Sequence, residues 1–121
     1  MKTKVLIVDD SLYMRSVLKN ILVDEGHEVV GEASNGNEAL QKAEALKPDL
    51  ITLDNIMPDI NGIEVLKKLK QNGSNAKVVM ISSVGQDAMV DEAMQVGASN
   101  YIIKPFTPER VVEVIDKVLL L

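Results

Sequence analysis

Short apolar runs of strand length alternate with longer amphipathic segments along the whole chain. The runs KVLIV, DLITL and KVVMIS show little polar alternation, which is expected of parallel strands buried on both faces. The segments between the runs have the length and the apolar spacing of helices. This alternation predicts an α/β fold, in which helices cover both faces of a parallel sheet.

The pattern predicts five βα units within one domain that spans residues 1–121, a common domain size. Strands are expected at 4–8, 28–33, 49–53, 77–82 and 100–103. Helices are expected at 12–25, 36–46, 62–71, 87–96 and 108–119. Because the run HEVVGEA mixes polar and apolar residues, the second strand should lie near an edge of the sheet.

The composition excludes several classes of function. A net charge of -5 without any basic run argues against nucleic-acid binding, which relies on lysine and arginine at phosphates. With no cysteine, the chain has neither disulfides nor thiolate metal sites. No apolar stretch approaches the length of a membrane span, and KTKVLIV is too short for a signal peptide. We therefore expect a cytoplasmic protein that binds neither nucleic acid nor membrane.

Charged residues follow the apolar runs at the points where strands should end. Asp9 and Asp10 follow the first run, Asp54 follows the third, and Lys104 closes the last. In open parallel sheets, ligands lie beyond the carboxyl ends of the strands. Carboxylates gathered there repel one another unless a cation neutralises them. The sequence therefore predicts a phosphate site that depends on a hard divalent metal ion.

Four separately placed motifs strengthen this interpretation. Asp9–Asp10, LDNIMPDING, the serines after KVVMI, and YIIKPF together resemble the receiver domain of bacterial response regulators, over essentially all 121 residues. The segments DDSLYMRSVL and KPFTPERVVE are similar to those of the single-domain chemotaxis regulators in that family. The resemblance implies a flavodoxin-like (βα)5 fold, a doubly wound five-stranded parallel sheet with strand order 2-1-3-4-5.

The resemblance also implies a reaction. Asp54 stands at the position that accepts a phosphoryl group from the phosphohistidine of a histidine kinase, and a carboxylate is an established nucleophile for this chemistry. Asp10, Asp54 and the backbone carbonyl of Ile56 would bind Mg2+ directly, while Asp9 would act through water. Taken alone, Asp54 could simply cap a turn, and Asp9 or Asp10 could cap the first helix.

Further site residues are implied by the same resemblance. Lys104 would pair with the phosphoryl group and with Asp54, and the bond between Lys104 and Pro105 would be cis. Ser82 would contact the phosphoryl group through its hydroxyl, and Tyr101 would be the aromatic switch residue. From the residue types alone, a solvated lysine, a turn-forming serine and a core tyrosine remain open alternatives.

The expected output is a signalling switch and not an enzyme, apart from self-phosphorylation and slow self-dephosphorylation. Phosphorylation would shift the population of a face made by the fourth helix, the fifth strand and the fifth helix. For a chemotaxis regulator, the expected partners of this monomer are a histidine kinase, a flagellar motor switch protein and a phosphatase. Ile56 and Val84 are apolar where family members influence hydrolysis, so we expect a long-lived phosphoryl group.

Two other functions remain open. A Mg2+-dependent phosphohydrolase with an aspartyl nucleophile usually has a second acid two residues further on, where this chain has Ile56. The chain could also be a phosphorelay intermediate, or the receiver of a DNA-binding regulator. The run VLLL at the end, with no linker or effector domain after it, favours a single-domain regulator.

Overall fold

The computed structural model describes residues 2–120, in which strands and helices alternate as the sequence predicts. The strands are β1 (Lys4–Val8), β2 (Glu28–Ala33), β3 (Leu50–Leu53), β4 (Lys77–Ser82) and β5 (Asn100–Ile103). The helices are α1 (Leu12–Asp24), α2 (Gly36–Leu46), α3 (Gly62–Gln71), α4 (Asp87–Val96) and α5 (Pro108–Leu119). No helix within residues 2–120 is long and apolar enough to cross a membrane.

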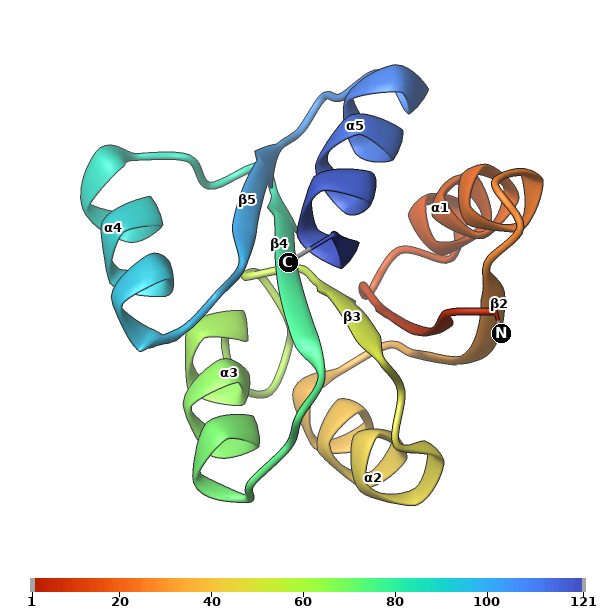
Figure 1. Cartoon of the computed structure of the whole chain (residues 1–121). Coiled ribbons are helices and arrows are strands. Elements are labelled where there is room, and N and C mark those ends of the chain that lie inside the picture. Colours follow the sequence, from red (N-terminus) through yellow and green to blue (C-terminus); the bar gives the residue numbers. More distant parts are fainter. Residues whose placement is uncertain (1, 121) are drawn as a thin grey trace.

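All five strands are parallel and form one sheet in the order β2-β1-β3-β4-β5. Helices α1 and α5 cover one face, and α2, α3 and α4 cover the other (Figure 1). This architecture confirms the predicted doubly wound, flavodoxin-like fold and places β2 at an edge. The register sets Val8 beside Leu53, and Ser82 beside Ile103, so these strands finish at the same level.

Two apolar cores hold the sheet between its helices. Side chains that alternate along the central strands enter opposite cores, because successive residues of a strand point to opposite faces. Leu6 and Ile51 enter the core under α2, α3 and α4, whereas Ile7 and Leu50 enter the core under α1 and α5. Each such buried side chain contributes about 1.5–3 kcal/mol of transfer free energy. The strand ends are therefore fixed relative to one another.

The elements begin and end close to the predicted bounds, and side-chain caps mark several helix starts. Ser11 and Thr107 cap α1 and α5, since their hydroxyl oxygens accept hydrogen bonds from the N–H groups three residues on. α1 ends at Asp24 and β3 begins at Leu50, each one residue from the predicted boundary. α2 is followed by Lys47 in the left-handed region (φ 47°), a cap that the sequence does not signal because glycine is the usual residue there.

The hydrogen-bond ladder of the sheet extends one residue past the strands that carry the acidic residues. The N–H of Asp9 donates to the carbonyl of Ala33 (3.0 Å), and the N–H of Asp54 donates to the carbonyl of Val8 (3.0 Å). The N–H of Lys104 donates in the same way to the carbonyl of Ser82 (2.9 Å). These bonds bring residues far apart in sequence to one edge of the sheet.

Candidate acidic site at the carboxyl end of the sheet

Three carboxylates meet where β1 and β3 end. Asp9, Asp10 and Asp54 each offer an oxygen within 4.8 Å of the others. Asp9 and Asp54 are buried, at 1% and 5% exposure, whereas Asp10 is exposed to solvent. The prediction that the strand ends gather these side chains is therefore correct in its geometry.

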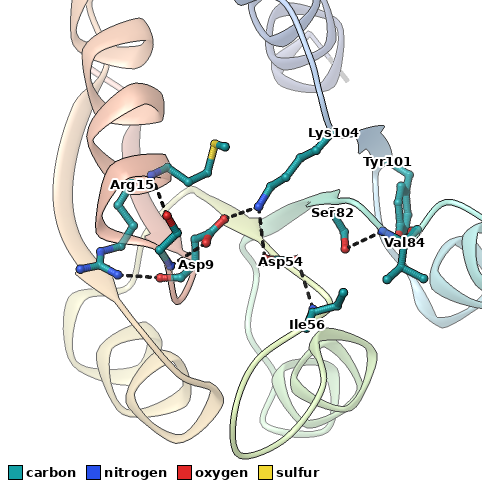
Figure 2. A network of polar contacts seen from close by, with 10 residues as sticks. Asp9, Arg15, Asp54, Ile56, Ser82, Val84, Tyr101 and Lys104 are labelled. Atoms are coloured by element: carbon teal, nitrogen blue, oxygen red, sulfur yellow. Dashed lines mark hydrogen bonds and ion pairs between the residues drawn. The ribbon is translucent and has the colours of Figure 1, made fainter.

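Lys104 supplies the positive charge of the cluster from the end of β5. Its Nζ lies 2.7 Å from Asp9 Oδ2 and 3.2 Å from Asp54 Oδ2 (Figure 2). The sequence predicted the contact with Asp54 but not the shorter one with Asp9. Burial lowers the pKa of Lys104, but the hydrogen bond to Asp9 and the two carboxylate charges outweigh it, so the pKa is raised. The ammonium is therefore held in its charged form, and the Lys104–Pro105 bond that follows is cis.

One ammonium does not balance three acidic groups. Burial raises the pKa of Asp9, and the hydrogen bonds from Lys104 and from the N–H of Ser11 do not fully offset this effect. The ionised form of Asp9 is therefore disfavoured when only protein groups surround it. A divalent cation would supply the missing charge, and carboxylate oxygens are the ligands that Mg2+ prefers. The donor set of this site thus fits Mg2+.

Backbone N–H groups orient the two buried carboxylates. Ser11 donates to Asp9 Oδ1 (2.9 Å), and Ile56 donates to Asp54 Oδ1 (3.1 Å). Asp54 is therefore held by the N–H of Ile56 on one oxygen and by Lys104 on the other. The Ile56 side chain is half exposed and lies beside this carboxylate (Figure 2).

The two serines after β4 differ in their surroundings. Ser82 is fully buried, and its hydroxyl oxygen accepts a hydrogen bond from the N–H of Val84 (3.2 Å). Ser83 is exposed. Of the two serines, only Ser82 thus has its hydroxyl enclosed by the protein.

Tyr101 lies inward from β5. Its ring is buried, at 7% exposure, and its hydroxyl donates to the backbone carbonyl of Val84 (Figure 2). Burial raises the pKa of this hydroxyl, so it acts as a donor at neutral pH. Ser82 and Tyr101 thus hold the two ends of the same residue, Val84. The sequence could not determine this orientation of the tyrosine.

The loop between β3 and α3 depends on two residues that sequence reasoning did not single out. Asn55 is buried and accepts hydrogen bonds from the N–H groups of Gly62 and Ile63. A Cβ on Gly62 would lie 2.4 Å from the carbonyl oxygen of Asp54, so only glycine allows this approach. This close approach is the physical reason for a glycine at the start of α3.

Asp59 and Arg15 also support the site and were not predicted. Asp59 accepts hydrogen bonds from the N–H groups of Gly36 (2.8 Å) and Asn37 (2.9 Å), which lower its pKa to about 2. This contact ties the β3–α3 loop to the start of α2.

Arg15, from α1, donates to the carbonyl of Asp9 (2.7 Å). Both contacts join residues distant in sequence, so no local pattern signals them.

Comparisons with known proteins show the family of this chain. The model of the response regulator receiver domain family matches residues 5–116. The chemotaxis protein CheY of Thermotoga maritima is 50% identical over 118 residues, 98% of each chain. The CheY of Bacillus subtilis is 47% identical over 98% of this chain and 99% of its own.

Among solved structures, the CheX–CheY–BeF3–Mg2+ complex from Borrelia burgdorferi contains a chain of the same fold. It superposes with a TM-score of 0.94 at 34% identity, over 97% of this chain and 89% of that one. The protein therefore belongs to the response regulator receiver domain family and is closely related to the CheY proteins of chemotaxis. Receiver domains of this kind are signalling modules of two-component systems.

Proposed function

We propose that this chain accepts a phosphoryl group on Asp54 from the phosphohistidine of a histidine kinase. An oxygen of the Asp54 carboxylate attacks phosphorus, and the bond from phosphorus to the histidine nitrogen breaks. The observation that carries the proposal is the placement of Asp54, which is buried and held from two sides by Lys104 and the N–H of Ile56.

Asp10, Asp54 and the backbone carbonyl of Ile56 are the groups proposed to hold Mg2+, with Asp9 acting through a water molecule. When bound, the metal ion would offset the negative charge of the phosphoryl oxygens and of the crowded carboxylates. The raised pKa of Asp9 is consistent with this assignment, because burial disfavours its charged form and a nearby cation would favour it.

Lys104 and Ser82 are proposed to bind the phosphoryl group once it is on Asp54. The Lys104 ammonium already contacts Asp54 Oδ2, so a charged donor lies where phosphoryl oxygens would develop charge. Ser82 is the buried hydroxyl at the end of β4. The Ser82 hydroxyl would exchange its hydrogen bond with Val84 for one to a phosphoryl oxygen.

The shared contact with Val84 supports a switch role for Tyr101. Movement of Ser82 would shift the loop after β4, and the Tyr101 hydroxyl bonds to that loop. Phosphorylation would thereby change the population of two arrangements of α4, β5 and α5. This face is the proposed output surface.

The CheY relatives support a place in chemotaxis for a single domain spanning residues 1–121. We expect a cytoplasmic monomer that receives phosphate from a histidine kinase and acts on a flagellar motor switch protein. Ile56 and Val84 are apolar and cannot hold an attacking water by hydrogen bonds. A separate phosphatase should therefore end the signal.

Intact mass measurement tests the central step. Acetyl phosphate with Mg2+ should add one phosphoryl group to the wild type and none to Asp54→Asn, and chelation of Mg2+ should prevent the addition. Addition of equal extent in the mutant would remove Asp54 from its assigned role. Steady release of phosphate from unrelated phosphomonoesters would instead support a phosphohydrolase.

A further inference from the structure

The three carboxylates of the site differ in what orients them. Asp9 is held by the N–H of Ser11 and by Lys104, and Asp54 by the N–H of Ile56 and by Lys104. Within residues 2–120, the Asp10 carboxylate makes no hydrogen bond or ion pair with another protein group. Among the described protein groups, only the backbone of Asp10 therefore determines where this exposed side chain begins.

Arg15 contacts that backbone from the first turn of α1. Its Nη1 donates to the carbonyl oxygen of Asp9 at 2.7 Å, and this carbonyl belongs to the peptide group between Asp9 and Asp10 (Figure 2). Because the peptide group is planar, fixing its oxygen also fixes the Cα of Asp10. A charged donor makes this hydrogen bond short and strong.

The guanidinium group is itself held from the other side. Arg15 Nε lies 3.0 Å from Glu32 Oε1, on the edge strand β2, and the arginine side chain is only 15% exposed. Two N–H groups of the planar guanidinium thus link Glu32 on β2 to the Asp9 carbonyl at the end of β1. A lysine in this position offers one point donor and could not span both acceptors in the same fixed geometry.

We infer that Arg15 is a positioning residue for the metal site, acting through the Asp9–Asp10 peptide to hold the Asp10 carboxylate where it can bind Mg2+. This inference rests on the proposed function, since it takes Asp10 as a ligand of the ion. Arg15 itself does not touch the ion in this role.

A positioning role predicts that loss of Arg15 weakens Mg2+ binding, whereas its charge alone predicts stronger binding. Arg15 is a positive charge close to a cation site, so its removal should strengthen Mg2+ binding through reduced repulsion. Loss of an outer partner that orients a ligand instead weakens metal affinity, by about 10-fold to about 100-fold. The sign of the change therefore distinguishes a positioning role from a charge effect.

The experiment is a Mg2+ titration followed by amide NMR, with no phosphodonor present. Arg15→Gln should raise the Mg2+ Kd by about tenfold, and Arg15→Lys should fall between that variant and the wild type. Arg110→Gln is the matched control, because Arg110 is the other arginine of the chain and forms an ion pair with Glu113 on the exposed side of α5. Lys19→Gln removes a charge 3.9 Å from Glu32 without touching the Asp9 carbonyl, so its Kd should not rise.

A Kd for Arg15→Gln equal to or below that of the wild type would overturn the inference, as would an equal loss in Lys19→Gln. The dispersion of the amide spectrum shows whether each variant is folded. If Arg15→Gln does not fold, wild-type affinity in Arg15→Lys overturns the inference. If Mg2+ does not shift the amide signals of Asp10 and Asp54 in the wild type, the proposed metal site itself is wrong. This result differs from a wild type that binds Mg2+ and an Arg15→Gln variant that binds it equally well.

Discussion

The two ends of the sheet differ in how their charged groups are arranged. The amino end has a cavity of about 730 Å3 between the last turns of α2 and α3, lined in part by Leu40, Leu69 and Lys77. Two of the charged side chains there are each bonded once to backbone. Lys77 Nζ donates to the carbonyl of Val118 (3.2 Å), and Asp49 accepts from the N–H of Lys4 (2.9 Å).

At the carboxyl end, in contrast, three carboxylates and one ammonium converge on a small volume. Burial of two of those carboxylates makes their charge costly, and the surplus of negative charge remains unbalanced. The cavity at the amino end thus lies away from the groups that can do chemistry. Converging, unbalanced charge, and not a cavity, distinguishes the proposed functional end of this sheet.

The largest expected effect comes from replacing Lys104, which follows β5 at the carboxyl end of the sheet. Lys77, which begins β4 at the amino end, is the matched control. Lys104→Met should slow phosphorylation by acetyl phosphate by between about a hundredfold and about a thousandfold, because a charged donor at the developing phosphoryl charge is lost. Lys77→Met should leave the rate unchanged. The time course of intact mass measures both, and similar slowing in the two variants would contradict the comparison.

Glycines at the two ends should also respond differently to alanine. Gly62→Ala should lower the free energy of unfolding by about 2–3 kcal/mol, since a Cβ there meets the backbone of Asp54 and Asn55. A Cβ on residue 73 would have no atom within 4 Å. Gly73→Ala should therefore lower the free energy of unfolding only by the strain of its positive φ of 76°, about 1 kcal/mol. Urea denaturation measures both, and an equal loss would show that the loop beside Asp54 can relax.

The lifetime of the phosphoryl group should depend on the half-exposed side chain beside Asp54. Ile56→Asn should speed dephosphorylation by about tenfold, because an amide can hold the attacking water by hydrogen bonds. Leu46→Asn makes a similar change of a partly exposed apolar residue at the amino end and should have no effect. Decay of the phosphorylated mass after removal of the donor gives the rate, and an unchanged lifetime in Ile56→Asn would count against this role.

The smallest effect should be the pH dependence of the stability that Asp59 contributes. Its carboxylate joins the β3–α3 loop to the start of α2. Because its pKa falls from 3.8 to about 2 on folding, its ionised form stabilises the fold above pH about 4. This contribution is lost as the pH falls through the window between about 4 and about 2. The stability difference between wild type and Asp59→Asn in urea denaturation should therefore shrink as the pH is lowered through that window, and a constant difference would exclude this linkage.

Much of the fold could be predicted because its signals are local. Runs such as KVLIV are apolar throughout because both faces of the strand are buried, and caps such as Ser11 and Thr107 act within one turn. The left-handed cap at Lys47 could not be predicted, because a lysine there carries no sequence signal. The contacts of Arg15 with Glu32 and of Asp59 with Gly36 join positions 17 and 23 residues apart, so only folding reveals them.

The sequence by itself determined that Asp9, Asp10, Asp54 and Lys104 lie at one edge of a parallel sheet, because strand polarity places every carboxyl end on the same side. Only the tertiary structure decided that Lys104 lies nearer Asp9 than Asp54, that Tyr101 points inward, and that Arg15 holds the Asp9 carbonyl. Local pattern fixes the element on which a side chain lies. Its rotamer and partners depend on atoms that packing brings from other elements.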